Sequence, residues 1–428
     1  MNKPFFLLVL GLTVHSTVFS QTDTLIIKTD TSGIKKDTLP AKKEFVQQDI
    51  KDWLADRKII KRKPPPKNFL LIIPIIASNP TAGFIFGGGF TYAFKVNQAY
   101  PRVSSITANA TYSTKGLLNL NMKSNAFVWR DRLVLNGDWR FLINHETTYG
   151  LGTTKYESGY IDINGYQTST DSLGQALQYN QVRIHETGSI KIFGNFFAGL
   201  GIHYDQFYNI IDKNDTATSY HYQYSIKHGF NPSEYVGAGF SLNLLFDSRD
   251  NQVNAYKGYY ANVNYRINLK GLTSTENSTM LLTEFRAFYP LDGQEKHRHI
   301  LGFWYYGSFA TSGNVPYLLL PALGYDQRQR TGRGYTFGRF RGENMMYGET
   351  EYRFPISRYT GILGGVLFAN CTTTSDKTHD VMLFDYLRAG YGGGLRIMMD
   401  KTSRTRLEID AGIADRSVGF YLGAQETF

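Results

Sequence analysis

The alternation of apolar and polar residues along this chain predicts an all-β fold, a transmembrane antiparallel β-barrel. Three observations support this fold class. Segments with a period of two recur from Asn68 to the last residue. Aromatic residues make up 15% of the chain, with 42 glycines against 13 prolines, which favours strands over helices. Beyond the N-terminal segment, no apolar run reaches the roughly 20 residues that a membrane-spanning helix needs.

Residues 1–20 have the pattern of a secretory signal peptide. Lys3 supplies a short basic region and the run from Phe5 to Leu12 an apolar core, and small residues precede a cleavage site before Gln21. A membrane anchor is the alternative, but the apolar run is too short to span a bilayer. The sequence therefore predicts export. Together with the barrel pattern, this places the protein in the outer membrane of a Gram-negative bacterium.

Residues 21–67 form a separate basic segment, which we expect to be a mostly disordered periplasmic linker. It has few large apolar residues and ends in the stiff run KRKPPPK. Within it, Val46, Ile50, Trp53 and Leu54 follow helical spacing, which predicts one short helix. Such a helix would either touch a membrane surface, plug an opening, or simply lie within a solvated linker; the composition favours the last.

Residues 68–428 carry the barrel pattern. In RLVLNGDWRFLIN, one face is apolar and the other polar, with Leu133, Leu135, Trp139, Phe141 and Ile143 opposing Asn136, Asp138, Arg140 and Asn144. A soluble sandwich also alternates, but its strands usually span about 5–6 residues. In a membrane barrel the apolar side chains face lipid, and the sheet must close because an open edge leaves backbone groups unpaired in lipid. At about 10 residues per strand, this region allows about 14 to 18 strands.

The barrel seam, where the first and last strands meet, is marked by Pro74 and Phe428. The first strand is predicted within NFLLIIPIIASNP, where Pro74 cannot donate a hydrogen bond to a neighbouring strand. The last strand is predicted to end in Phe428, which shares parity with Phe420 and Leu422. Pro74 then either weakens the seam, giving a lateral gate, or makes an ordinary kink at the barrel rim.

The charge and the motifs of the sequence argue against nucleic-acid binding, metal or cofactor binding, and enzymatic activity. The formal net charge of +10 suits an anionic surface, and the expected partners include outer-membrane lipid and lipopolysaccharide. The basic residues are spread along the chain without a nucleic-acid-binding motif, so no nucleic acid partner is expected. Cys371 is the single cysteine, and the histidines lack metal-ligand spacing, so we expect neither a metal nor a cofactor. No nucleophile motif is present, and the protein is not expected to be an enzyme.

Three segments resemble the bacterial surface antigen barrels, the outer-membrane assembly factor (BamA/TamA) family. The first is FDSRDNQVNAYKGYYANVNY, whose Asp247, Arg249, Asn251 and Gly258 match that family's turn motif. The second is LPALGYDQRQRTGRGYTFGRFRGENMMYGETEYRFPI, which is similar to the family's sixth extracellular loop, with Arg333, Gly334 and Tyr335 in place of its Arg-Gly-aromatic motif. The third is YGGGLRIMMDKTSRTRLEIDAGI, which leads to the terminal strand.

The resemblance implies a sixteen-stranded barrel whose Arg333 loop folds back into the lumen. Glu349, Glu351 and Arg353 share parity on the strand that follows, so we expect their charges to face the lumen and Glu351 to be the main partner of Arg333. Where the family has an aspartate on the next strand, this sequence has Asn370, which is expected to accept a hydrogen bond from Arg333.

The resemblance also implies a function without covalent chemistry, the insertion or translocation of other proteins at the outer membrane. The clients would be unfolded outer-membrane proteins. Residues 21–67 are too short for the POTRA domains that precede such barrels, so a periplasmic partner is expected to replace them. The alternative is a passive pore or structural surface barrel without client handling. Arg339 and Arg341 are expected to line the loop or the outer mouth, near lipopolysaccharide.

Overall fold

The computed structural model describes residues 45–62, 68–79, 83–96, 102–153, 162–163, 166–167, 174–293, 299–415, 417–424 and 426–428. The predicted signal peptide, residues 1–20, lies outside the described residues, as do residues 21–44 and 63–67 of the predicted linker.

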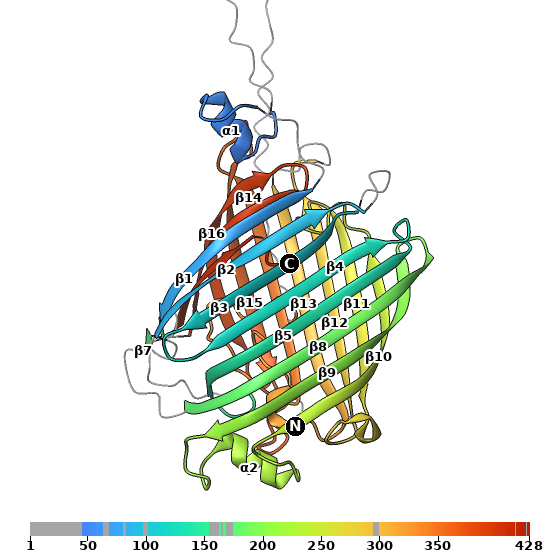
Figure 1. Cartoon of the computed structure of the whole chain (residues 1–428), viewed down its shortest axis with the longest axis vertical. Coiled ribbons are helices and arrows are strands. Elements are labelled where there is room, and N and C mark those ends of the chain that lie inside the picture. The colour runs from blue at the N-terminus through green and yellow to red at the C-terminus, as the bar shows by residue number, and fades with distance from the viewer. Residues whose placement is uncertain are drawn as a thin grey trace, which may run out of the picture. The chain divides into compact units, whose positions relative to one another are not determined.

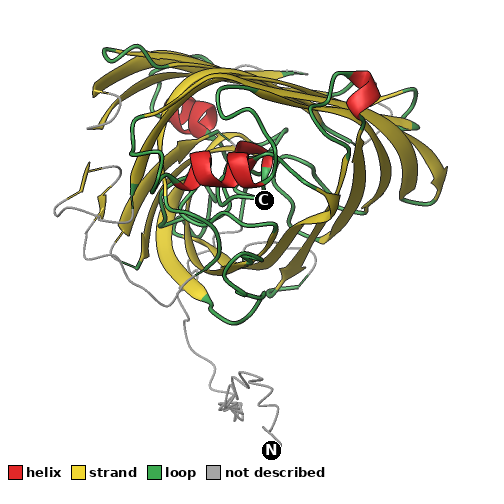
Figure 2. Ribbon diagram, turned by 90° about the horizontal axis from the view of Figure 1, so that it is seen from below, coloured by secondary structure: helices red, strands yellow, loops and turns green. Residues whose placement is uncertain are grey.

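Sixteen long antiparallel strands form one sheet that curves into a barrel (Figures 1 and 2). They are β1 (Phe69–Asn79), β2 (Gly83–Phe94), β3 (Ser104–Ser113), β4 (Leu118–Val128), β5 (Leu133–Thr148), β8 (Gln175–Phe193), β9 (Phe196–Asp212), β10 (Tyr235–Asp247), β11 (Gly258–Asn268), β12 (Ser278–Pro290), β13 (Ile300–Gly313), β14 (Asn344–Pro355), β15 (Leu363–Thr374), β16 (Arg388–Asp400), β17 (Thr405–Ala414) and β18 (Ser417–Gly423). The short strands β6 (Asp162–Ile163) and β7 (Tyr166–Gln167) lie in the connection between β5 and β8. The predicted all-β barrel of sixteen strands is confirmed.

Each long strand pairs with its neighbour along the chain, and β5 pairs with β8 across the β6–β7 insertion. The first and last strands are the exception. Among the described residues, β1 pairs with β2 and β18 pairs with β17 and, over two residues, with β6, but β1 and β18 do not pair with each other. Pro74 lies in β1 opposite Gly88 of β2. The barrel therefore has a seam, between β1 and β18, that lacks backbone pairing.

The burial pattern of the strands is that of a membrane barrel. In β10, the polar Ser241 and Asn243 are buried, whereas Phe240, Leu242 and Leu244 are 50%, 55% and 61% exposed. A soluble sheet would bury the apolar face and expose the polar one. In a membrane barrel the outward side chains meet lipid, so exposed apolar residues are stable there. Among the described residues, no helix has both the length and the apolar character to cross a bilayer.

The short helix α1 (Ile50–Asp56) lies at the end of the barrel that carries the shorter turns (Figure 1). Asp49 caps it, accepting hydrogen bonds from the backbone of Lys51 and Asp52, and the Asp52 carboxylate lies 2.6 Å from Nζ of Lys401 after β16. Outer-membrane barrels have short periplasmic turns and longer extracellular loops. This assigns the α1 end to the periplasm and the long connections 213–234 and 314–343 to the cell exterior.

An apolar cap lies at the extracellular end. It joins α2 (Tyr220–Lys227) to the 3-10 helix η2 (Tyr317–Leu319), while η1 (Lys270–Leu272) is a separate turn in the next loop. The Tyr224 hydroxyl donates to the carbonyl of Val315 at 2.9 Å, and the Leu318 amide donates to the Tyr235 hydroxyl at 3.0 Å. The buried rings of the cap therefore fasten α2 to the start of loop 314–343.

The prediction that Phe428 closes the last strand at the seam is wrong. β18 ends at Gly423, and residues 426–428 are buried among lumenal side chains. Phe428 is 3% exposed, and its ring stacks against Trp304 with 5.4 Å between centroids. Arg353 donates to the main-chain oxygen of Phe428 at 3.2 Å, and Arg396 binds Glu426 at 2.8 Å. These interactions, together with an aromatic pocket, draw the C-terminus away from the wall.

The cap has a built-in pH dependence at His221 of α2. Its ring is fully buried against Tyr317 and lies 3.8 Å from Oδ2 of Asp212. Burial lowers the pKa of His221 to about 4, against an opposing effect of Asp212. An unfolded histidine titrates near 6.5, so the cap has its full stability above about pH 6.5 and loses it as the pH falls toward 4.

We expect hydrogen-exchange protection of the α2 amides, corrected for the intrinsic pH effect, to fall by up to about 3 kcal/mol between pH 7 and pH 4. His221→Phe should flatten this dependence, whereas His379→Phe, at a side chain that is 76% exposed, should leave it unchanged. Equal protection of the wild type at both pH values would contradict the assignment.

Candidate functional site

Loop 314–343 enters the lumen and carries Arg333 between two glycines with left-handed backbone. Gly332 has φ +82° and Gly334 has φ +106°, a region that side chains rarely occupy. A Cβ at Gly334 would lie 2.9 Å from the carbonyl carbon of Ile413 in β17, so the loop also approaches the wall too closely for a side chain. The glycines thus let the turn press against the wall and direct Arg333 along it.

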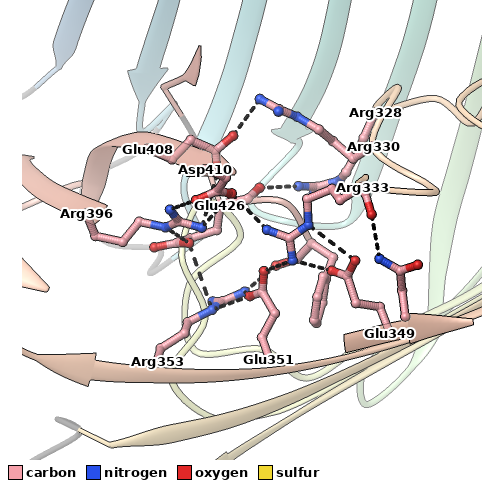
Figure 3. A network of polar contacts seen from close by, with 12 residues as sticks. Arg328, Arg330, Arg333, Glu349, Glu351, Arg353, Arg396, Glu408, Asp410 and Glu426 are labelled. Atoms are coloured by element: carbon pink, nitrogen blue, oxygen red, sulfur yellow. Dashed lines mark hydrogen bonds and ion pairs between the residues drawn. The ribbon is translucent and has the colours of Figure 1, made fainter. Parts of the chain in front are cut away.

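The guanidinium of Arg333 is fully buried among three carboxylates (Figure 3). Its Nη2 lies 2.5 Å from Oε1 of Glu349, its Nη1 lies 2.8 Å from Oδ2 of Asp410, and Nη2 also donates to Glu351. One face of the guanidinium lies over the ring of Phe368, 3.6 Å from the centroid. Five donors in a planar fork suit this arrangement, which a lysine could not reproduce.

The two residues that follow Arg333 are held as well. The Gly334 amide donates to the Tyr421 hydroxyl of β18 at 2.8 Å, and the Tyr335 hydroxyl donates to the carbonyl of Ala389 in β16 at 2.8 Å. Arg333, Gly334 and Tyr335 therefore contact strands β14, β16, β17 and β18, which fixes the loop to one side of the wall.

The structure places Glu351 in contact with Arg333 but adds two partners that the sequence did not single out. Glu349 shares parity with Glu351 on β14, and Asp410 comes from β17, which is separated from β14 by two strands of the sheet. The expected role of Asn370 is wrong. Its side-chain amide donates to the main-chain carbonyl of Arg333 at 2.9 Å, because the three carboxylates already occupy the guanidinium.

The Arg333 site belongs to a larger buried network (Figure 3). Arg353 joins Glu351 at 2.7 Å, Arg396 joins Glu426 at 2.8 Å, and Arg330 joins Glu408 at 2.5 Å. Among the described residues, the network consists of Arg330, Arg333, Arg353, Arg396 and Arg406 with Glu349, Glu351, Glu408, Asp410 and Glu426. We name it the lumenal ion network. Among these ten described side chains, five cations match five anions.

The electrostatics of the loop follow from this balance. Burial by itself would lower the pKa of the Arg333 guanidinium, but Glu349, Glu351 and Asp410 raise it well above the ordinary value. A buried ion group is costly to break, because removing one member leaves the others charged, desolvated and unpaired. Every charged group of the site forms an ion pair with another group of the site. The site is therefore suited to holding the loop against the wall, and we call it a brace.

The turn motif Asp247, Arg249, Asn251 and Gly258 lies apart from Arg333, at the periplasmic turn between β10 and β11. Arg249 forms a bidentate pair with Asp247, at 2.9 and 2.8 Å. Asn251 accepts from the amides of Val253 and Asn254 and donates to the carbonyl of Ser403 in the turn after β16. Gly258 has φ +105° where β11 begins. The motif thus builds a rigid turn that is fastened across the periplasmic mouth.

Arg341 was expected to line the loop or the outer mouth, and it lies within the loop next to the extracellular cap, where its Nη1 donates to the carbonyl of Tyr317 at 3.1 Å. It is fully buried, and its Nη2 lies 3.0 Å from Oε1 of Glu146 on β5. Arg339 stacks over the ring of Tyr149, 4.2 Å from the centroid. The loop is thus fastened to β5 on one side of the lumen and to β14 and β17 on the other. Among the described residues, no cluster of His, Cys, Asp and Glu could hold a metal ion.

Comparison with known proteins identifies the family. The family model described as the Omp85 superfamily domain matches residues 102–428. The chain belongs to the Omp85 superfamily. A solved structure of BamA from Haemophilus ducreyi lacking POTRA domains 1–3 is similar, with a TM-score of 0.50 and 13% identity over 84% of this chain and 70% of that one. No curated protein matches the sequence.

Two further solved structures are CdiB from Acinetobacter baumannii and CdiB from Escherichia coli, each with a TM-score of 0.48. Their identities are 12% and 9%, and they cover 82% and 85% of this chain. This chain spans 57% and 62% of theirs. Omp85 barrels reside in the bacterial outer membrane and form a non-enzymatic family of protein insertion and translocation factors, so the predicted location is confirmed.

Replacing Arg333 should destabilise the barrel strongly. Arg333→Ala leaves Glu349, Glu351 and Asp410 buried with less counter-charge, at a cost of roughly 3–5 kcal/mol. Urea unfolding in lipid vesicles measures this loss. Arg62→Ala removes the same charge from an exposed ion pair and should change stability by less than about 1 kcal/mol. Equal effects of the two variants would show that the brace carries no stability.

Asn370→Asp, which introduces the family residue, should destabilise this chain. The new carboxylate would lack the amide that binds the Arg333 carbonyl and would place a negative charge directly opposite Glu349. We expect a loss of about 1–3 kcal/mol of unfolding free energy. Asn370→Ala removes the hydrogen bond alone, so a larger loss for aspartate than for alanine isolates the charge repulsion. Stabilisation by aspartate would instead mean that a carboxylate here reaches the guanidinium.

Proposed function

We propose that this barrel assists the insertion or translocation of proteins at the outer membrane, as BamA/TamA-type assembly factors do, and that clients engage it at the seam between β1 and β18. The observation that carries the proposal is the absence of backbone pairing between these two strands in the described part of the chain. Family membership supports it, because insertion and translocation factors make up the superfamily.

The free edge of β1 supplies the recognition chemistry. An unpaired strand edge presents a row of N–H and C=O groups that a second strand can pair with. Pro74 lacks an N–H, so the edge is interrupted near the middle of β1. A client strand would therefore pair in two short stretches, which supports transient rather than permanent pairing. Unfolded outer-membrane proteins, whose strands are amphipathic, are the proposed clients.

The loop and the network would keep the rest of the wall rigid while the seam opens. Gly334 contacts Tyr421 of β18, so the fixed loop holds one side of the seam, whereas β2 is the only strand that pairs with β1 among the described residues. Movement at the seam is thus expected on the β1 side. We further propose that residues 1–20 direct export and that a periplasmic partner brings clients to the α1 end.

A passive pore is the competing function. Loop 314–343 and the cap of α2 and η2 place buried side chains inside and over the lumen, which argues against an open pore through it. Steady conductance of the wild type in planar bilayers, together with no effect on client folding, would favour the pore.

The test is a seam lock in liposomes. In a Cys371→Ser background, Ile72→Cys and Leu422→Cys place thiols on the lipid-facing sides of β1 and β18, at positions 69% and 53% exposed. A short bis-maleimide crosslinker then joins the two strands. We expect wild type to accelerate the folding of an unrelated outer-membrane protein, and the crosslinked variant to lose at least about tenfold of that acceleration.

The matched control is Ile409→Cys with Leu422→Cys. These two residues are register partners on β17 and β18, so the same crosslinker joins strands that are already paired. This variant should keep the wild-type acceleration. Failure of wild type to accelerate folding would reject the proposed function, and full activity of the seam-locked protein would reject the seam as the site of client engagement.

A further inference from the structure

A cavity of 670 Å³ lies directly behind the unpaired seam. Ile73 and Ile75 of β1 and Phe420 to Gly423 of β18 line its outer side, and loop residues 327–330 line its inner side. Cavities of about 300–1,000 Å³ hold ligands of drug size. The cavity is therefore large enough for part of an amphipathic molecule, and it lies between the lumen and the strands that face lipid.

The charges around this cavity are strongly one-sided. Its described lining includes the cations Lys123, Arg249, Arg286, Arg328 and Arg330, and Glu426 is the single anion among these described residues. Arg249, Arg286 and Arg330 have carboxylate partners in Asp247, Glu284 and Glu408. Lys123 and Arg328 have no carboxylate within 4 Å in the described part of the chain. Two cations therefore face the cavity without a counter-charge.

The contacts of these two cations leave most of their donors free for a ligand. The described residues give Nζ of Lys123 one partner, Oε1 of Gln329 at 3.3 Å. They give the Arg328 guanidinium one hydrogen bond, from Nη1 to the Glu426 carbonyl at 3.3 Å. Burial, with Arg286 and Arg249 nearby, lowers the pKa of Arg328 to about 9. Burial thus destabilises the charged guanidinium of Arg328, and a bound anion would stabilise it.

The turn that carries Arg328 is rigid. The Asp326 carboxylate accepts hydrogen bonds from the amides of Arg328, Arg330 and Thr331, at 2.9 to 3.0 Å, and from the Thr331 hydroxyl at 2.7 Å. Gln329 has φ +57°, which closes the turn. Asp326 is therefore engaged by backbone donors rather than by the Arg328 side chain, so the turn presents the cation without neutralising it.

The strand that borders the cavity, β1, carries apolar residues on both faces over residues 70–75. Leu70 and Ile72 of β1 are exposed toward lipid, and Ile73 and Ile75 line the cavity. A lumenal face is normally polar. An apolar inner face beside uncompensated cations suits a molecule that has an acyl chain next to an anionic group.

We propose that this cavity binds a phosphate-bearing membrane lipid, with the phosphate held by Lys123 and Arg328 and an acyl chain lying along Ile73 and Ile75 into the seam. Charge-assisted hydrogen bonds from an arginine and a lysine suit a phosphate, and the unpaired edge gives the chain a route between lumen and bilayer. The proposal concerns a lipid site and does not depend on client insertion. A bound lipid would fill the space behind β1, where the wall lacks a hydrogen-bonded partner.

Native mass spectrometry of the full chain released from detergent tests this. The probes are a lipid A with phosphate groups, phosphatidylglycerol, the zwitterionic phosphatidylcholine, and inorganic phosphate as competitor. We expect one lipid A or one phosphatidylglycerol molecule to be retained per barrel. The lipid that is retained at higher occupancy identifies the class of ligand. Lys123→Gln with Arg328→Gln should lower occupancy at least about tenfold. Because this change removes repulsion among cations, the barrel should remain folded.

The matched control, Arg62→Gln with Lys270→Gln, removes one arginine and one lysine charge from exposed ion pairs and should retain the lipid. Ile75→Trp, which fills the cavity from β1 and leaves the cations in place, should also lower occupancy. Equal binding of phosphatidylcholine, equal occupancy in the Lys123/Arg328 variant, or a site filled by inorganic phosphate to the exclusion of lipid would each overturn the proposal.

Discussion

The lumen of this barrel is organised by one guanidinium, that of Arg333, held between carboxylates from two strands that do not adjoin. Glu349 and Glu351 lie on β14 and Asp410 lies on β17, with β15 and β16 between them. Without Arg333, these buried carboxylates would repel one another across the wall. The same residue fixes the loop, because its flanking glycines press the turn against β17. One side chain thus links loop conformation, strand arrangement and charge balance.

The lumenal ion network also accounts for the open seam. Arg396 binds Glu426 and Arg353 binds the main-chain oxygen of Phe428, so these residues lie in the lumen rather than along β18. β18 consequently ends at Gly423, and β1 has no hydrogen-bonded partner on that side among the described residues. The interactions that stabilise the loop therefore also direct the residues after β18 into the lumen.

The sequence predicted the features that depend on periodicity and missed those that depend on register. The alternation of apolar and polar residues places Glu351 on the lumenal face of β14. Its contact with Arg333 follows because the two residues lie close together in the sequence. Asp410 lies on a face that parity also identifies, but its approach to Arg333 depends on the stagger of four strands. Phe428 shared parity with the strand before it, yet ion pairs and an aromatic pocket end that strand early. The sequence predicted that Asn370 accepts a hydrogen bond from Arg333, by analogy to a family aspartate. In the structure the three carboxylates bind the guanidinium, and Asn370 instead donates to the main-chain carbonyl of Arg333.

The distribution of charge separates two kinds of lumenal cation. The five arginines of the network are matched by five carboxylates, so their exchange with a ligand would leave buried anions unpaired. Lys123 and Arg328 have no such partner in the described part of the chain, because the one carboxylate in the Arg328 turn, Asp326, is saturated by backbone donors. Binding an anion at Lys123 and Arg328 breaks no existing ion pair, so the binding free energy is not reduced by the loss of one. The lumen therefore combines a brace whose charges are permanently paired with a site, next to the seam, whose charges are free to be neutralised from the membrane.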